Sequence, residues 1–248
     1  MKRLLISSCI FGALAVGAQA QISYTTLGGT YSENFDSMTS TGTTTPAGWF
    51  VGRLTGAISG TGVVPSSGNS TTGTNYNFGV AGVNSVEERA LGSLGAATAS
   101  QFDTEVRFVN NTGRTITDLR ITFDGEQWRS GGPTQVPNTL AMQYSINGSS
   151  FTSMGSMFDF TSPIVGATAG QLDGNAAANR VAGISGVFVP STPVANGTTM
   201  YLRWVDVDDA SSDAGLAIDN FVFSAIPEPT AIGLTALAGV VLIFRRRR

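Results

Sequence analysis

A group of aspartates near the C-terminal end of the sequence has the residue types that bind a hard cation. Asp206 and Asp208 occupy alternate positions of a strand-like run, and Asp209 and Asp213 follow in a short polar loop. Ca²⁺ takes six to eight oxygen ligands, and carboxylates, serine hydroxyls and backbone carbonyls of such a loop can supply them. The spacing differs from the twelve-residue EF-hand loop. We predict a Ca²⁺ site at these four aspartates; the alternative is that they form turns, caps and a salt bridge to Arg203.

Aromatic residues suggest a second kind of site, because an aromatic ring packs well against the apolar face of a sugar ring. Trp128 stands at the end of a strand-like run, beside Arg129 and before a Gly131-Gly132-Pro133 loop. We predict that Trp128 and Arg129 contact a glycan. The alternative is that Trp128 lies in the core, where the large aromatic residues of a β-sandwich often pack.

Paired carboxylates raise the question of catalysis. Glycoside hydrolysis needs two carboxyl groups about 5 to 10 Å apart across a cleft, and Glu88 and Glu126 are the candidates. The sequence contains no histidine, and its single cysteine, Cys9, lies in a segment that we expect to be removed. Histidine-dependent and thiolate-dependent catalysis are therefore excluded. We predict a protein that is not an enzyme, with a carboxylate-dependent hydrolase or lyase acting on glycans as the alternative.

The charge of the body, residues 21–225, limits its partners. This segment has eight arginines, no lysine and 16 acidic residues, which gives a net charge near −8. An acidic surface does not attract a polyanion. We therefore expect no nucleic acid partner for the folded part, whereas basic partners and metal cations remain.

Alternation of apolar and polar residues predicts an all-β body. The alternation is clear from residue 114 to 124, where it has the period of 2 that is typical of a strand with one buried face. Similar runs span residues 101–109, 140–146, 200–207 and 216–223. The turn sequence Asn-Thr-Gly-Arg between the first two runs predicts an antiparallel hairpin.

Two stretches rich in Gly, Ser, Thr and Asn, residues 39–45 and 56–79, are predicted to be surface loops. No linker divides the body. We predict a single jelly-roll-like β-sandwich that spans residues 21–225.

The two ends of the chain have the features of export signals. Residues 1–20 combine Lys2 and Arg3, an apolar run and a final Ala-Gln-Ala, which predicts a signal peptide that is cleaved after Ala20. Residues 226–248 combine prolines, an apolar stretch of about 15 residues and four arginines. A helix over this stretch reaches only about 22 Å, which is marginal for a bilayer core of about 30 Å. The arginines predict that this end stays in the cytoplasm and that the body lies outside.

The C-terminal segment resembles the PEP-CTERM sorting signal of exported bacterial proteins. The resemblance rests on Pro227, Glu228 and Pro229, the apolar stretch, and the final arginines, which are Arg245, Arg246, Arg247 and Arg248. It implies a transmembrane helix, recognition by an exosortase-type membrane protease, cleavage near the prolines, and delivery to the cell surface or to the exopolysaccharide matrix. The alternative is an ordinary C-terminal anchor that stays intact.

A further set of short motifs in the body resembles the jelly-roll modules of bacterial choice-of-anchor and cleaved-adhesin proteins. The motifs are Glu33-Asn34-Phe35-Asp36, Pro46-Ala47-Gly48-Trp49, Arg89-Ala90-Leu91-Gly92-Ser93, Leu202-Arg203-Trp204-Val205-Asp206 and Gly215-Leu216-Ala217-Ile218-Asp219-Asn220-Phe221. This resemblance implies a lectin-like sandwich, with Ca²⁺ and glycan binding in some members and no catalytic set. We therefore expect an exported structural or adhesive protein that binds polysaccharide.

Overall fold

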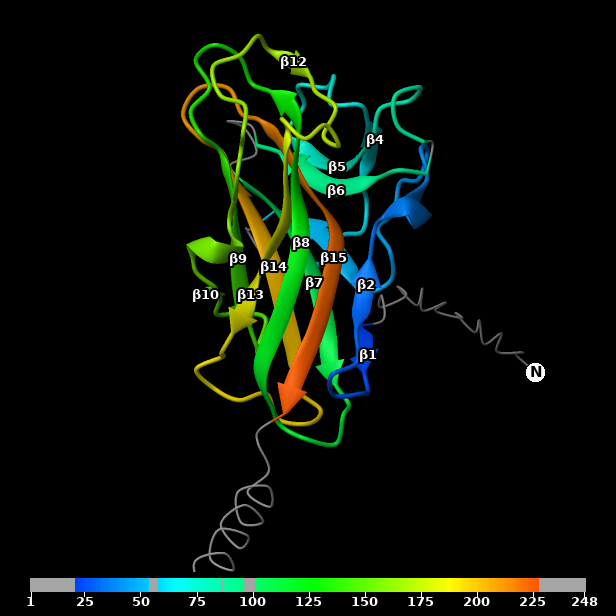
Figure 1. Ribbon diagram of the computed structural model, residues 1–248, viewed down its shortest axis with the longest axis vertical. Helices are drawn as coiled ribbons and strands as arrows, with labels where there is room; N and C mark the ends of the chain where they lie inside the picture. The colour runs from blue at the N-terminus through cyan, green and yellow to red at the C-terminus, as the bar shows by residue number, and fades with distance from the viewer. Residues whose placement is uncertain (1–20, 54–57, 86, 96–100, 228–248) are drawn as a thin grey trace, which may run out of the picture.

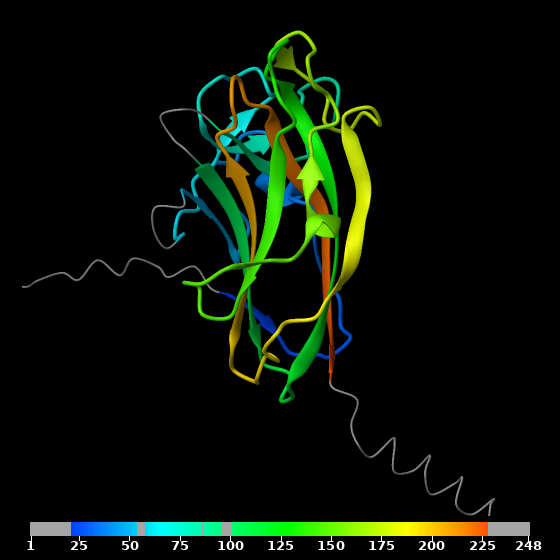
Figure 2. The same ribbon diagram turned by 90° about the vertical axis from the view of Figure 1, so that its left-hand side faces the viewer.

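The computed structural model describes residues 21–53, 58–85, 87–95 and 101–227 as two β-sheets packed face to face. Figure 2 shows the two layers from the side, with the core between them. The prediction of an all-β sandwich is confirmed. The predicted signal peptide and residues 228–248, which include the predicted membrane span, lie outside the described residues. Among the described residues, no helix is both long enough and apolar enough to cross a membrane.

The first layer, sheet A, has β14 at its centre. Its strand order is β1-β7-β14-β9-β10, with β3 also paired to β7 and β11 also paired to β9. The strands are β1 (Ile22–Tyr24), β3 (Trp49–Gly52), β7 (Gln101–Asn110), β9 (Thr139–Ser145), β10 (Thr152–Ser153), β11 (Phe160–Thr161) and β14 (Thr199–Val207). Two short 3₁₀ helices, η1 (Asp36–Met38) and η2 (Ser156–Phe158), lie in the connections.

The second layer, sheet B, is built around the long pair β8 and β15, which run side by side at the front of Figure 1. Its order is β12-β8-β15-β6-β5-β4, with β13 also paired to β8 and β2 also paired to β15. The strands are β2 (Tyr31–Glu33), β4 (Val64–Ser66), β5 (Thr74–Phe78), β6 (Ala90–Leu94), β8 (Ile116–Ser130), β12 (Gly170–Gln171), β13 (Arg180–Phe188) and β15 (Gly215–Pro227).

Aromatic rings from both sheets meet at the centre of the core. Trp49 of β3 stacks on Trp204 of β14 with a centroid distance of 5.9 Å and an interplanar angle of 20°. Phe221 of β15 contacts both indoles edge-on, at 5.2 Å and 5.5 Å. All three side chains are fully buried. This cluster joins the two layers because each sheet contributes at least one ring.

A second, smaller core lies on the other face of sheet B. Leu216 and Ile218 belong to the main core, whereas Ala217 between them packs in the second cluster. The members of this cluster are Tyr76, Phe78, Val80, Ala90, Leu94, Trp128 and Ala217. The loop after β12 covers it, since a Cβ placed on Gly174 would collide with the indole of Trp128. The prediction of a surface loop over residues 56–79 is therefore wrong in part, because β4 and β5 lie within this range.

The predicted hairpin between residues 101–109 and 114–124 is also wrong. Both strands exist, but β7 belongs to sheet A and β8 to sheet B, so the turn between them crosses from one layer to the other. The Asn110 side chain holds this crossover, since its Nδ2 donates to the carbonyl oxygens of Arg114 and Val194. The strands expected near residues 140–146, 200–207 and 216–223 are present as β9, β14 and β15. β15 continues to Pro227, two residues beyond the predicted end of the body.

The central cluster gives a prediction about stability. Replacing Trp204 by alanine leaves a cavity between the sheets, and we expect a loss of about 3–5 kcal/mol in the free energy of unfolding. Val207→Ala is the matched control, because Val207 lies at the end of the same strand and is 41% exposed; we expect a change within about 0.5 kcal/mol there. Urea unfolding of the full chain measures both. Equal losses in the two variants would contradict the assigned core.

Candidate functional site

A polar pocket lies where β8 ends and the chain passes from β14 to β15. Figure 1 shows these segments at its upper end. We call this pocket the loop-end pocket. Its volume is about 220 Å³, and β6, β8 and the loops before β5 and β15 supply its walls. The lining residues are Thr71, Leu94, Gly95, Arg129, Gly131, Asp208, Ser211, Ser212 and Asp213. Hydroxyl, carboxylate and guanidinium groups therefore share one small space.

The loop between β14 and β15 forms one wall and is fixed by Asn138. The Asn138 Nδ2 donates to the Asp209 carboxylate at 2.8 Å, and its Oδ1 accepts the Ala214 N–H at 2.5 Å. Within the loop, the Asp209 N–H donates to Asp213 Oδ1 at 3.0 Å. These bonds satisfy polar groups at both ends of the loop, so the Asp208 and Asp213 side chains are held in place beside the pocket.

Glycines let the opposite wall approach this loop. A Cβ on Gly131 would collide with the carbonyl oxygen of Ser212, and a Cβ on Gly95 would lie 2.8 Å from Asp213 Oδ2. Larger residues at either position would push the walls apart. The Gly131-Gly132 sequence thus serves the close packing of the pocket walls.

The pocket combines one cation with two carboxyl groups. Burial raises the pKa of Asp213 to about 7, and the hydrogen bond with Asp208 acts in the same direction, whereas the hydrogen bond from the Asp209 N–H acts against it. Arg129 donates from Nη1 to the carbonyl oxygen of Gly68 at 3.1 Å, which orients its guanidinium at the pocket wall. Donors and acceptors are thus both available to a ligand.

Of the four aspartates predicted to bind Ca²⁺, only Asp208 and Asp213 line the loop-end pocket. Asp206 is 1% exposed and points between the sheets, where its Oδ2 accepts the Ser93 hydroxyl at 2.7 Å. Asp209 is engaged by Asn138. In the described part of the chain, no three Asp, Glu, His or Cys side chains are grouped so that they could hold a metal ion. The arrangement does not support a Ca²⁺ site at Asp206, Asp208, Asp209 and Asp213, because Asp206 and Asp209 are engaged by Ser93 and Asn138.

The structure places the two residues predicted to contact a glycan, Trp128 and Arg129, in different surroundings. Trp128 is 0% exposed and lies parallel to Phe78 in the second core, with 6.0 Å between centroids. Its faces are covered, so the prediction that it stacks on a sugar is wrong. Arg129, the next residue of β8, lines the loop-end pocket beside Asp208 and Asp213.

The alternative catalytic pair is not placed for hydrolysis. Glu126 is 0% exposed, and its Oε2 accepts the Trp128 indole N–H at 3.0 Å. Burial raises the pKa of Glu126 to about 8 and that of Asp219, also on sheet B, to about 9. Glu88 is half-buried. A substrate cannot reach Glu126 without displacement of the covering loop.

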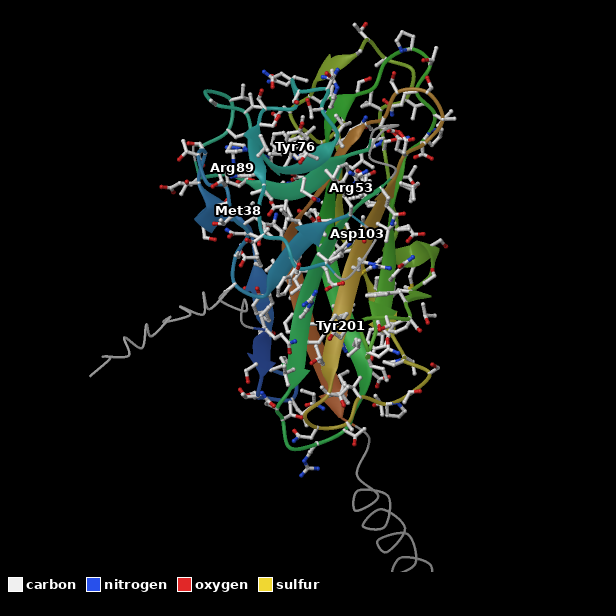
Figure 3. The ribbon with its side chains drawn as sticks, turned by 180° about the vertical axis from the view of Figure 1, so that it is seen from behind. Met38, Arg53, Tyr76, Arg89, Asp103 and Tyr201 are labelled. Atoms are coloured by element: carbon white, nitrogen blue, oxygen red, sulfur yellow. The ribbon has the colours of Figure 1, made fainter. Side chains whose placement is uncertain are left out.

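Sequence reasoning missed a charged cluster on the outer face of sheet A, the face that Figure 3 presents. Arg203 pairs with Asp103 at 3.5 Å and lies over the Phe151 ring, with 3.5 Å to its centroid. The predicted alternative partner of Arg203, the acidic loop, is not its partner here. Arg107 pairs with Glu105 at 2.6 Å. The period of the strands does place Asp103, Glu105 and Arg203 on one face of the sheet. Predicting which of them pair would have required the register of β7 with β14.

Comparison with known proteins gives no family. No family model matches the chain, and no curated protein matches it. Several solved structures are similar in fold. One is the CBM22-1 xylan-binding domain of Xyn10C from Paenibacillus barcinonensis, with 10% identity over 83% of this chain and 100% of that domain and a TM-score of 0.43.

Two other similar structures are also small domains. The K3 cleaved adhesin domain of Lys-gingipain from Porphyromonas gingivalis has 14% identity over 79% of this chain and 98% of its own, with a TM-score of 0.40. The CBM27-1 module of Caldicellulosiruptor saccharolyticus, in complex with mannohexaose, has 11% identity over 78% and 96%, with a TM-score of 0.37. With TM-scores below 0.5, no property of these proteins is transferred to this chain.

The buried carboxyl groups predict how stability depends on pH. Burial raises the pKa values of Asp206 and Glu126 to about 8, far above those of the unfolded chain near 4. The native state therefore binds more protons than the unfolded state between about pH 4 and pH 8, and stability falls as pH rises through this range. We expect the full chain to melt at a lower temperature at pH 8 than at pH 5.

The control separates this effect from general charge effects. Asp206→Asn removes one titrating group and keeps an acceptor for Ser93, so the melting temperature should fall less between the two pH values. Asp118→Asn, at a half-buried site of β8, should leave the fall in melting temperature between the two pH values as it is in the parent protein. A melting temperature that rises from pH 5 to pH 8 would contradict the assignment.

Proposed function

We propose that this protein is exported to the cell surface or the extracellular matrix, where its β-sandwich binds a glycan through the loop-end pocket. The observation that carries the proposal is the convergence of Arg129, Asp208 and Asp213 on one pocket with the serine hydroxyls of the same loop. The role is structural or adhesive.

The chemistry of the pocket suits a ligand rich in hydroxyl groups. Arginine only donates hydrogen bonds and an ionised aspartate only accepts them, whereas a hydroxyl group does both. A sugar can therefore use both kinds of wall at once. The volume of about 220 Å³ is below the roughly 300–1,000 Å³ of sites for drug-sized ligands, so it fits a chain end or one sugar unit.

A binding role is favoured over catalysis. The alternative function, a glycan hydrolase or lyase, needs two carboxyl groups that reach the substrate across a cleft. Full burial of Glu126 argues against the pair Glu88 and Glu126. The net charge near −8 over residues 21–225 argues against a nucleic acid partner.

Export and sorting are proposed from the two ends of the sequence. The segment 1–20 would direct secretion, and residues 226–248 would act as the sorting segment, with a membrane helix and a final cluster of arginines. The partner would be an exosortase-type protease that acts near Pro227, Glu228 and Pro229. β15 ends at Pro227, so a cut after this residue would leave the whole strand in the sandwich.

Removal of the pocket cation tests the binding site. We expect Arg129→Ala to weaken retention by the bound polysaccharide at least tenfold, because the pocket loses its donor. The matched control is Arg120→Ala, an exposed arginine on the same strand. Retention is measured by affinity electrophoresis of the full chain in gels that contain xylan, mannan, galactan or dextran. The chain is kept in a detergent without a sugar headgroup. If no gel retards the parent protein, or if Arg129→Ala is retarded equally, the proposal is wrong.

The sorting proposal has a separate test. We expect the protein in the extracellular matrix of its native cells to begin at Gln21 and to end close to Pro227, since both signals would have been removed. Intact-mass measurement of the matrix and membrane fractions reads both ends. A membrane-only form that retains Arg248 would identify an ordinary anchor and refute processing by an exosortase.

A further inference from the structure

A second pocket lies at the other end of β9, β13 and β14. We call it the β9–β13 pocket. It opens between the end of β9, the start of β10 and the segment after β13, and its volume is about 230 Å³. Its walls include Tyr144, Phe188, Val189, Ser150, Thr152 and Thr192. None of its lining residues carries a charge, so the pocket suits a neutral ligand.

Tyr144 gives this pocket an unmet need for a hydrogen bond. The side chain lines the pocket and is 7% exposed, yet its hydroxyl has no hydrogen-bond partner among the described residues. An unpaired buried hydroxyl is unfavourable, and such a group calls for an explanation. Burial raises the pKa of Tyr144, so at neutral pH the hydroxyl keeps its proton. The hydroxyl is buried, and a ligand acceptor that reached it from the pocket would satisfy it.

The walls match the two kinds of surface that a sugar ring presents. Tyr144 and Phe188 form an aromatic pair with centroids 5.2 Å apart, and Phe188 is only half-buried. Val189 beside it is 65% exposed. An apolar wall of this kind packs on C–H groups, while the exposed hydroxyls of Thr152 and Thr192 pair with sugar hydroxyls.

We infer that the β9–β13 pocket is a second ligand site, which holds one neutral pyranose ring between the Tyr144–Phe188 wall and the surrounding hydroxyls. It differs from the loop-end pocket in the absence of charge, so the two sites select different sugars or different parts of one glycan. The volume again admits one ring and excludes a longer segment.

The two pockets are separate along the sandwich. Tyr144 is opposite Leu202 near the start of β14, whereas Asp208 of the loop-end pocket follows the end of the same strand. Six residues at about 3.3 Å each place the pockets roughly 20 Å apart. One chain can therefore hold two glycan strands at once and link them. This linking role rests on the proposed function of the loop-end pocket, but the second site does not.

The test isolates the second site by working in the Arg129→Ala background. The probes are glucose, galactose, mannose and xylose, and saturation-transfer NMR on the full chain in a detergent without a sugar headgroup reports binding. We expect at least one sugar to bind in this background. Adding Tyr144→Phe, which keeps the ring and removes only the unpartnered hydroxyl, should reduce the signal at least fivefold.

Two further variants test whether the sugar binds in the β9–β13 pocket. Thr152→Trp fills the pocket from an exposed position on β10 and should also abolish binding, whereas Tyr201→Phe, a tyrosine outside the pocket lining, should leave it unchanged. Melting temperatures confirm that each variant is folded. If no sugar binds in the Arg129→Ala background, or if Tyr144→Phe and Thr152→Trp bind as before, the second site is refuted.

The outcomes separate this inference from the proposed function. If the single variant Tyr144→Phe loses binding and the single variant Arg129→Ala binds as the parent chain does, the β9–β13 pocket is supported and the loop-end pocket is refuted as a binding site. Light scattering measures whether the chain links polysaccharide molecules, through the particle size of a mixture with a polysaccharide that binds. The parent chain should raise the particle size, and either single-site variant should bind without raising it. An equal rise in the single-site variants would refute linking through these two pockets.

Discussion

The contact of Trp49 and Trp204 with Phe221 is the interaction on which the rest of the structure depends. Trp204 lies on β14 and Phe221 on β15, so the cluster fixes these two consecutive strands in opposite layers. The chain between them must cross the end of the sandwich, and this crossing forms the Asp208–Asp213 wall of the loop-end pocket. Packing of apolar rings thus positions a polar site to which none of them contributes an atom.

Local alternation was sufficient to predict β9, β14 and β15, because apolar residues recur at every second position over at least part of each strand. It was not sufficient for β5, since the sequence around Tyr76 and Phe78 is polar and glycine-rich and these rings are buried by packing against distant residues such as Trp128. The same rule could have separated Trp128 from Arg129. Adjacent strand residues point to opposite faces, so one site could not use both side chains. Pairing of β7 with β14, rather than with β8, depends on the whole topology.

The buried carboxyl groups change how the acidic composition should be understood. The formal charge near −8 over residues 21–225 assumes that every acid is ionised. Burial raises the pKa of Asp103 to about 7, of Glu126 and Asp206 to about 8 and of Asp219 to about 9. Several of these groups hold protons at neutral pH, so the field around the body is weaker than the composition suggests. A neutral ligand at the proposed site would not depend on that field.

The central position of β15 has a mechanical consequence. This strand has β8 on one side and β6 and β2 on the other. A tether attached beyond Pro227 would pull on the strand at its C-terminal end and along its own axis. The hydrogen bonds to the neighbouring strands would then bear the load together in shear, instead of opening one after another like a zip. A sandwich pulled in this way would resist unfolding more strongly than one pulled across its strands.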